Sequence, residues 1–503
     1  MQNTTHEGGC TLSPLNSSTP EQLTSRIRRF LALPSELPWI EFKENANVTG
    51  PEIAKYVSAL GNAATLYDEP AGYLVWGISD SRELVGTNFS PFTAKGKGGT
   101  DLIPWLRINI NPKPDLRFDD VTVEDKKVIL LRIPAARNQP YTYDGQRFIR
   151  DGSYTKNLLS APDKERALWK KLSKFDFETD IVAENIDPSA IGDYLNLDAF
   201  FSNRPEIPHG TGQLLLDTLK QDGAVTYNHE LGWCIPAWSA LMYANRISDF
   251  VILRNLAPRV LQFNSSTRTD LKREWTFDEG YISSFSKVME LFKLIQPGGE
   301  SIDPSGRRVV AQPLPSIAFR EVYANALMHQ DLEDRERFLT IEVFSDHIDV
   351  TNPGKPLVDP QRFIDAASTT RNPVLGEALR QAHFVEQRGS GWDKIVSSLE
   401  EQHFPPALTR TNGSTTVTLS AYRPYAMMTQ MERLQAVYQH SCLRFLENRP
   451  VNNSSVRARF GLKDTQVSQV SRLLKAAVED KLIKPYDPAA GPKSLRYVPY
   501  WAE

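Results

Sequence analysis

Three acidic residues and a lysine near the start of the chain have the types and spacing that suit phosphodiester chemistry. Glu36 lies on a turn before Pro38, Glu41 and Lys43 follow in an E-x-K pattern, and Asp80 ends the run YLVWGISD. Carboxylate oxygens are the ligands that Mg²⁺ prefers. A divalent metal, Mg²⁺ or Mn²⁺, activates water, and a lysine stabilises phosphate. We therefore expect Glu36, Glu41 and Asp80 to be catalytic metal ligands. Lys43 is the fourth candidate catalytic residue.

Two strands must position these residues. Alternation in the first strand places Trp39, Glu41 and Lys43 on one face. Ile40 and Phe42 then occupy the other face. The later run GYLVWGI is short, continuously apolar and bounded by glycine, which is typical of a strand buried on both faces. Because E-x-K also occurs by chance in many strands, a solvated strand face is the alternative interpretation.

The neighbouring segments predict one α+β domain over residues 25–170, after a loose polar arm over residues 1–24. The segment PEIAKYVSALGNAAT has Ile53, Val57 and Leu60 at helical spacing. KKVILLRIP repeats the pattern of a buried strand. YTYDGQRFIRDGSYTKN contains a D-G turn that is typical of a hairpin.

Taken in order, these motifs resemble the Alba-like core domain of the Schlafen family, over roughly residues 30–160. SELPWIEFKENAN has an acid, four residues and then E-F-K, and EIAKYVSALGNAA contains S-A-x-x-N. GYLVWGISDSRELVG is similar to the family's glycine-started strand, and RFIRDGSYTKN to its closing R-x-G-S-x-T segment. The chain departs from the pattern at Leu37 and at TLYDEP, which is inserted after Asn62.

The resemblance implies an endoribonuclease that cuts structured RNA, notably tRNA, with the three acids named above as its active site. It also implies a role in phage defence or in stress shut-off of translation. Lys95 and Lys97 in AKGKGG, and Arg147 and Arg150 in the closing hairpin, are candidate contacts to RNA phosphates. Solvated surface residues are the alternative for each of them. Nucleic-acid binding without cleavage also stays open.

A second group of residues, further along the chain, suits nucleotide chemistry. FREVYANALMHQ places Glu321, Asn325 and Met328 on one helical face. The Asn carbonyl can hold Mg²⁺ and the Glu can orient or deprotonate water. TNPG after a strand and RGSG before a helix allow close approach of backbone N–H groups to phosphates. No G-x-x-x-x-G-K-[ST] motif occurs, so a Walker-type ATPase is unsupported.

This order of motifs resembles the GHKL ATPase fold, and more closely its divergent form that follows Schlafen-like domains in bacterial proteins. The resemblance makes Asn325 a Mg²⁺ ligand and Glu321 the candidate base. Those relatives are often labelled helicase-like, but the sequence contains no helicase motif. A degenerate fold that serves only dimerisation is the alternative, and hydrolysis of ATP is left open.

The same resemblance places Asn352 and Gly354 at the adenine and Gly389 and Gly391 at the phosphates. Arg371, in the segment STTRNP, would contact phosphate near the lid. The main family pattern has an aspartate before the glycine turn, whereas this chain has Asn352, whose carbonyl can still accept from the adenine amine.

The last segment predicts a winged helix-turn-helix. Asp464 or Thr465 would cap its second helix, whose core-facing residues are expected to be Val467, Val470, Leu473 and Leu474. Gln466, Gln469 and Arg472 would be exposed and able to reach base edges. Arg457, Arg459, Lys475, Lys481 and Lys484 make the segment locally basic. Protein contacts are the alternative use of such a domain.

Bulk properties limit the remaining classes. The chain has 503 residues, too many for one core, and a net charge of −3 that excludes a global positive field. Its three cysteines are too widely spaced to predict disulfides or a metal site. With no signal peptide and no long apolar run, we expect a cytoplasmic protein without membrane contact.

We predict a multidomain α+β protein with five segments: arm 1–24, Schlafen Alba-like domain 25–170, connecting α/β module 171–275, GHKL-like sandwich 276–425 and winged helix 431–503. The expected function is ATP-binding, metal-dependent cleavage of RNA by a homo-oligomer. The alternative is a non-enzymatic, ATP-responsive DNA-binding regulator.

Overall fold

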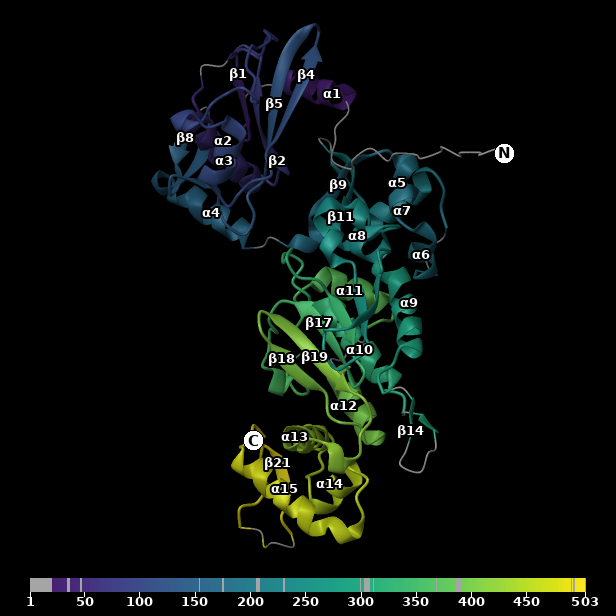
Figure 1. Ribbon diagram of the computed structural model, residues 1–503. Helices are drawn as coiled ribbons and strands as arrows, with labels where there is room; N and C mark the ends of the chain where they lie inside the picture. Colours follow the sequence, from purple (N-terminus) through teal and green to yellow (C-terminus); the bar gives the residue numbers. More distant parts are fainter. Residues whose placement is uncertain are drawn as a thin grey trace, which may run out of the picture. The chain divides into compact units, whose positions relative to one another are not determined.

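The computed structural model is mixed α+β and divides after Asp176 into two compact units, a first unit and a second unit (Figure 1). It describes residues 20–33, 37–45, 48–152, 154–173, 176–204, 209–228, 231–298, 300–302, 308–310, 312–367, 369–385, 391–489, 491 and 494–502. Most of the predicted arm lies outside these residues, but its last part is helical, because α1 already starts at Pro20. Among the described helices, none is both long and apolar enough to cross a membrane.

The first unit contains two four-stranded sheets and four α-helices. Its sheets have the orders β1-β2-β5-β4 and β3-β6-β7-β8, and β1 runs parallel to β2. The elements are α1 (Pro20–Leu31), β1 (Ile40–Lys43), α2 (Gly50–Leu66), β2 (Ala71–Trp76), α3 (Leu102–Asn109), β3 (Ile110–Asn111), β4 (Arg117–Val123), β5 (Lys126–Pro134), β6 (Thr142–Tyr143), β7 (Gln146–Asp151), β8 (Tyr154–Asn157) and α4 (Pro162–Leu172).

Helix α2 is the central helix of this unit. Ile53, Val57 and Leu60 are buried in one core with residues of β2 and β5, which confirms the predicted amphipathic helix. The helix packs so closely on β2 that a Cβ on Gly72 would lie 2.6 Å from the Leu60 carbonyl oxygen. A side chain at that position would force the helix off the sheet.

The S-A-x-x-N motif at the end of α2 ties the helix to the closing hairpin. Asn62 is fully buried, and its Nδ2 donates to the carbonyls of Tyr141 at 3.0 Å and Phe148 at 2.9 Å. Its Oδ1 accepts from the Tyr141 amide at 2.8 Å. Ser58, one turn earlier, donates to the Tyr141 carbonyl and accepts from the Phe148 amide. The two side chains therefore satisfy buried main-chain groups that no strand partner reaches.

The second unit contains the remaining elements. They are β9 (Ile181–Ile186), α5 (Ile191–Tyr194), α6 (Leu197–Ser202), α7 (Gln213–Asp222), β10 (Thr226–Asn228), β11 (Gly232–Pro236), α8 (Ala237–Tyr243), β12 (Arg259–Phe263), β13 (Leu271–Thr276), α9 (Tyr281–Leu294), β14 (Glu300–Ile302), β15 (Arg308–Val310), α10 (Ser316–His329), β16 (Thr340–Val343), β17 (His347–Pro353), α11 (Pro373–Gln381), α12 (Gly391–Glu401), β18 (Leu408–Thr411), β19 (Ser414–Ser420), α13 (Gln430–Leu446), α14 (Asn453–Arg459), α15 (Val467–Glu479), β20 (Ile483–Pro485) and β21 (Tyr497–Pro499).

A six-stranded sheet of order β13-β12-β16-β17-β19-β18 forms the middle of this unit. The predicted boundary at residue 276 is wrong, because β12 and β13 lie before it and β12 pairs directly with β16. The helix-facing side of the sheet is apolar and includes the buried residues Ile341 and Val350. Helix α10 packs on this side, in contact with β17 and α12.

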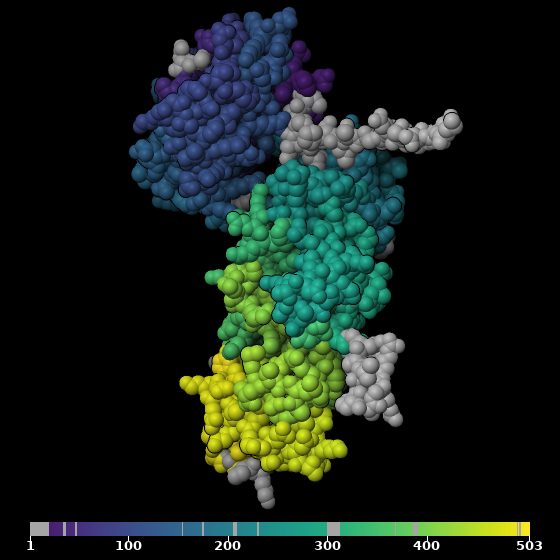
Figure 2. All heavy atoms as spheres, viewed as in Figure 1, coloured from purple at the N-terminus to yellow at the C-terminus, as the bar shows by residue number. Residues whose placement is uncertain are grey.

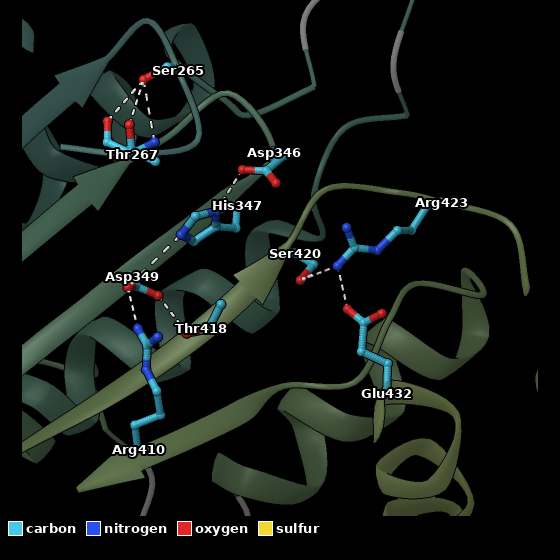
Figure 3. Close-up of polar contacts among 10 residues, drawn as sticks. All are labelled: Ser265, Thr267, Asp346, His347, Asp349, Arg410, Thr418, Ser420, Arg423 and Glu432. Carbon is cyan, nitrogen blue, oxygen red and sulfur yellow. Dashed lines mark hydrogen bonds and ion pairs between the residues drawn. The ribbon is translucent and has the colours of Figure 1, made fainter. Parts of the chain in front are cut away.

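The opposite side of the sheet carries acidic residues that are paired with basic ones, as Asp349 is with Arg410 (Figure 3). Asp349 of β17 is 4% exposed and accepts hydrogen bonds from Thr418 on the neighbouring strand β19 and from Arg410 on β18, the strand beyond it. Glu342, its cross-strand neighbour, forms a two-pronged ion pair with Arg268, with both distances 2.6 Å. Because these acids are already neutralised, the apolar side is the one left for a ligand.

The predicted connecting module supports the six-stranded sheet's helices. Its first three strands form a sheet of order β10-β11-β9, and helix α8 contacts α11. Glu178 is fully buried and accepts from the amides of Val374, at 3.0 Å, and Leu375 at the start of α11. A carboxylate in this position satisfies unpaired amides and the helix dipole. The module is therefore part of the scaffold of the second unit.

The chain ends in three helices, α13 to α15, and the antiparallel pair β20–β21, which we call the C-terminal bundle (residues 430–502). Val470, Leu473 and Leu474 are buried in its core as predicted, but Val467 is 46% exposed, so that assignment is wrong. Helix α15 begins at Val467, and Val470 is the residue of its first turn that reaches the core. Asp464 belongs to a preceding 3₁₀ turn.

Candidate functional site

Strand β1 positions the first group of candidate residues. Ile40 and Phe42 are buried in an apolar core, which confirms the predicted alternation. Glu41 points to the other side, yet it is also buried, with 4% exposure. The Lys43 ammonium lies 2.6 Å from Glu41 Oε1, so the two members of E-x-K form an ion pair. The solvated strand face that was the alternative is therefore excluded for Glu41.

Arg150 of β7 supplies the second partner of this carboxylate. Its guanidinium pairs with Glu41 Oε2 and is 1% exposed. The prediction that Arg150 contacts RNA from the surface is wrong, because the residue is a buried counter-ion. Tyr56 of α2 completes the group, with its ring 5.1 Å from Lys43 Nζ and 5.9 Å from Arg150 Cζ. We call these four residues the Glu41 cluster.

The Glu41 cluster carries more positive than negative charge. Burial disfavours the Lys43 ammonium, but the hydrogen bond and charge of Glu41 outweigh it and raise the Lys43 pKa. Burial and the charge of Glu41 raise the pKa of Tyr56, so the phenol is neutral at pH 7. Within these four residues two cations face one carboxylate, and Lys43 is the cation that is partly exposed.

The described residues do not form a divalent-metal site in this unit. Asp80 is exposed just beyond β2, and Glu36 lies outside the described residues. Both oxygens of Glu41 are taken by Lys43 and Arg150. Within the part of the chain that the structure describes, no three acidic, histidine or cysteine side chains are grouped to hold a metal.

The other predicted RNA contacts of the first unit differ in solvent exposure and in whether they form ion pairs. Lys97 is exposed in the glycine-rich loop. Lys95 is exposed as well but pairs with Asp101. Arg147 pairs with Glu165 at 3.1 Å and is 32% exposed. Lys97 is thus the most accessible of the four cations that the sequence singled out.

The second candidate site is a pocket between the apolar side of the six-stranded sheet and helices α10 and α12. It encloses about 160 Å³. Four residues predicted for the nucleotide line it: Glu321 and Asn325 of α10, Asn352 of β17 and Gly391 of α12. A fifth, Gly389, lies outside the described residues. Elements far apart in the sequence therefore bring most of the predicted site together.

Helix α12 begins directly against the polar face of α10. A Cβ on Gly391 would lie 3.2 Å from Glu321 Oε2 and 3.5 Å from Asn325 Nδ2, so glycine permits the close approach. Glu321 is 3% exposed and pairs with Arg320. The Asn325 side chain, half-buried at the pocket, makes no hydrogen bond with any described residue. Its carbonyl fits the role of a Mg²⁺ ligand.

Asn352 presents an acceptor at the other end of the pocket. It is 6% exposed, and its Nδ2 donates to the Pro353 carbonyl at 3.0 Å, which leaves Oδ1 to accept. The following Gly354 has a φ of 94°, and its carbonyl accepts from Thr415 at 2.9 Å. In this orientation, Oδ1 of Asn352 can accept a hydrogen bond from the exocyclic amine of a base.

Arg371 stabilises the turn at Gly354. Its guanidinium donates to the Lys355 carbonyl at 2.8 Å and lies 3.6 Å from Asp331. It does not line the pocket, whereas the exposed Lys355 does. Lys355 was missed because it belongs to no recognised motif, although it directly follows N-P-G. It is the only lysine or arginine among the described residues lining the pocket.

Two ionisable groups near the pocket have shifted pKa values. Burial, with the positive charge of Arg371, lowers the pKa of His329 to about 4, so this lining residue is neutral at pH 7. Burial raises the pKa of Asp393 in the first turn of α12. Asp393 Oδ1 is buried without a hydrogen-bond partner among the described residues. Neither residue was selected from the sequence.

The predicted DNA contacts of the C-terminal bundle are only partly exposed. Arg472 is exposed on α15, and the half-buried Gln469 accepts from Gln466 at 3.3 Å. Arg459, one of the residues that make this segment basic, is 4% exposed and donates to the Phe404 carbonyl at 2.9 Å. It therefore joins the bundle to the segment that precedes β18.

Comparisons with known proteins identify both sites' domains. Residues 36–159 match the family model described as "Schlafen, AlbA_2". Residues 336–419 match the model HATPase_c_4, described as "Putative ATP-dependent DNA helicase recG C-terminal". No curated protein matches the chain.

Five chains of solved structures match. One is the DIP2311 protein from Corynebacterium diphtheriae, which is 15% identical, with 95% of this chain and 99% of that chain covered and a TM-score of 0.36. The two matches lie in the order that the motifs predicted, so the chain carries a Schlafen AlbA_2 domain followed by an ATPase-type domain.

Proposed function

We propose that this chain binds ATP in the pocket of the second unit and acts on structured RNA through its first unit. The observation that supports ATP binding is the convergence of Glu321, Asn325, Asn352 and Gly391 around one cavity. It joins an acceptor for a base amine, a glycine helix start and an amide oxygen that has no other described partner. Such a combination suits a nucleotide better than an apolar ligand.

Asn325 would hold Mg²⁺ in this pocket, and the ion would neutralise phosphate charge. The protein's own contributions are those of named groups. Asn352 orients the base, the start of α12 directs its amides at anions, and Lys355 adds a cation at the rim. Glu321 lies beside Asn325 and is positioned to orient water, so hydrolysis of ATP is part of the test.

Calorimetry with Mg²⁺ and ATP tests the pocket directly. Asn325→Ala should weaken binding, by tenfold or so for the loss of one contact to an ionic group of about 1.5 kcal/mol. Asn264→Ala, an exposed asparagine of the same unit, is the matched control and should bind as the parent does. Equal affinity of the parent and the Asn325→Ala protein would remove Asn325 from the site.

For the first unit we propose contact with RNA phosphates at the Glu41 cluster, with tRNA as the expected substrate class. The support is the partly exposed Lys43 of the cluster, the exposed Lys97 of the same unit and the Schlafen AlbA_2 match. Metal-dependent cleavage is the finer proposal, and it rests on the motif around Glu41 alone. We derive no metal step, because the described acids do not form a metal site.

Cleavage is tested by incubating labelled tRNA with the protein and Mg²⁺ or Mn²⁺, with and without ATP. Loss of cutting in Glu41→Ala supports a nuclease, and cutting that persists in that variant indicates a contaminant. Salt-sensitive DNA binding with no cleavage supports the alternative, an ATP-responsive regulator. Phosphate release without cut nucleic acid supports an ATPase whose first unit is a docking platform.

A further inference from the structure

Two aromatic residues of the C-terminal bundle hold a segment beside the nucleotide pocket. The Tyr438 hydroxyl donates to the main-chain carbonyl of Gln361. The Trp501 indole donates to the Tyr438 hydroxyl at 3.1 Å. The Trp501 ring also faces the guanidinium of Arg362, whose Cζ lies 4.6 Å from the ring centroid. The bundle thus holds Gln361 by a hydrogen bond and the next residue, Arg362, by a cation–π contact.

The segment held in this way continues directly into the pocket wall. We call residues 361–367 the wall segment. Phe363 and Ala366 line the pocket, and the Phe363 ring lies edge-on to Trp392 with centroids 5.0 Å apart. Ile364, between them, is 7% exposed and belongs to an apolar cluster that includes Tyr438 of the bundle. An outward shift of the wall segment therefore breaks contacts with the bundle.

Helix α12 connects the pocket to the bundle a second time. Its first residue, Gly391, lines the pocket. Near its other end, Glu400 lies 2.7 Å from His440 Nδ1 of α13 and 3.6 Å from Arg459 of α14. In the space-filling view, the yellow residues of the bundle lie directly against the green residues of the ATPase-type part (Figure 2). Two walls of the pocket are thus anchored on the same bundle.

The volume of the pocket indicates what this anchoring does. Its 160 Å³ is below the roughly 300–1,000 Å³ of sites that bury a drug-sized ligand. A nucleoside triphosphate is at least that large, so the pocket must widen to admit it, and the wall segment is the part of its lining that the bundle holds. We propose that the C-terminal bundle is an autoinhibitory clamp, which holds the wall segment in a narrow position and lowers the affinity of the pocket for ATP.

The inference rests on the proposed function of the pocket and deepens it with a form of regulation. If the wall segment is displaced from its narrow position in only a fraction of the molecules, the apparent dissociation constant for ATP is the intrinsic constant divided by that fraction. Anything that frees Trp501 or Tyr438 from the wall segment then increases ATP binding. By reciprocity, ATP favours the released bundle by the same factor.

Trp501→Ala tests the clamp, because it removes both the indole donor and the ring that faces Arg362. We expect calorimetry with Mg²⁺ and ATP to show about fivefold or greater tightening, the lower end of typical allosteric coupling. Hydrogen exchange of the wall segment should rise in the ligand-free variant. Arg362→Met breaks the same contact from the wall side and should act in the same direction, even if Trp501→Ala does not fold.

The matched control is Tyr486→Ala, which removes an aromatic ring of the same bundle that is 66% exposed. It should leave ATP affinity unchanged. If the parent binds ATP and both contact variants bind equally or more weakly, the clamp is refuted while the proposed function stands. If neither the parent nor the variants bind ATP at millimolar concentration, the proposed function fails and the clamp fails with it.

Discussion

Replacing Arg150 by methionine is the sharpest test of how the Glu41 cluster is built. The substitution keeps most of the side-chain volume but removes the guanidinium that pairs with Glu41 Oε2. Arg150 is 1% and Glu41 6% exposed in their side chains, so solvent cannot replace the lost partner. Removing one member of such a buried pair costs about 3–5 kcal/mol. The remaining Lys43 contact places the expected cost at the lower end of this range.

Hydrogen exchange measured by mass spectrometry on the full chain reports this cost where it arises. At 1.4 kcal/mol per factor of ten, exchange of the amides in β1 and β7 should accelerate by about 10² to 10³. Arg147→Met is the matched control on the same strand. Its partly exposed pair with Glu165 is worth at most about 1 kcal/mol, so exchange should change about fivefold or less.

A double variant separates pairing from packing. Glu41→Gln combined with Arg150→Met removes both charges of the buried pair and leaves only the partly exposed Lys43 without its partner. The combined cost should therefore be at least about 1 kcal/mol less than the sum of the two single costs. Strictly additive costs, or an effect of Arg150→Met no larger than that of Arg147→Met, would refute the buried ion pair. Glu41 would then be available to a ligand in the resting protein.

Three further predictions concern other parts of the structure. Asn62→Ala removes the side-chain partner of the Tyr141 amide and of the Phe148 carbonyl, so it should destabilise the closing hairpin by about 2–5 kcal/mol, measured as faster exchange of the hairpin amides. The pKa of His329, about 4, lies below the 6.5 of an unfolded histidine. Protonation therefore favours unfolding, stability falls as pH drops from 6.5 towards 4, and His329→Asn should lose that part of the pH dependence in thermal melts. Glu178→Gln should destabilise α11 by about 1–2 kcal/mol, seen as faster exchange at its first turn.

Each of these predictions has its own contrary outcome. Unchanged exchange in the hairpin of Asn62→Ala, beside Asn88→Ala as an exposed control, would mean that the motif is not structural. A His329→Asn protein with the parent's pH profile would place the acid sensitivity elsewhere. Equal protection of α11 in Glu178→Gln would show that the helix start does not depend on the connecting module.

The sequence alone was sufficient for features that depend on local spacing. Periodicity identified α2, because residues three and four apart on one face of a helix are buried together, as Ile53, Val57 and Leu60 are. The D-G pair predicted the turn between β6 and β7, where Gly145 has a φ of 70°. The E-x-x-x-N and glycine motifs selected four residues that line one pocket, because each motif sits at the end or on the face of one such element.

Only the tertiary structure decided which distant residues pack against these elements and pair with their side chains. Strand alternation put Glu41 and Lys43 on one side, but only the fold brings Arg150, 109 residues later, onto that carboxylate and buries both. In the same way, the pairing of β12 with β16 places residues before position 276 in the six-stranded sheet. Trp501 contacts Arg362, which lies 139 positions earlier in the sequence. Local spacing reports the direction of a side chain, whereas its burial, charge partner and pKa depend on distant segments that no spacing records.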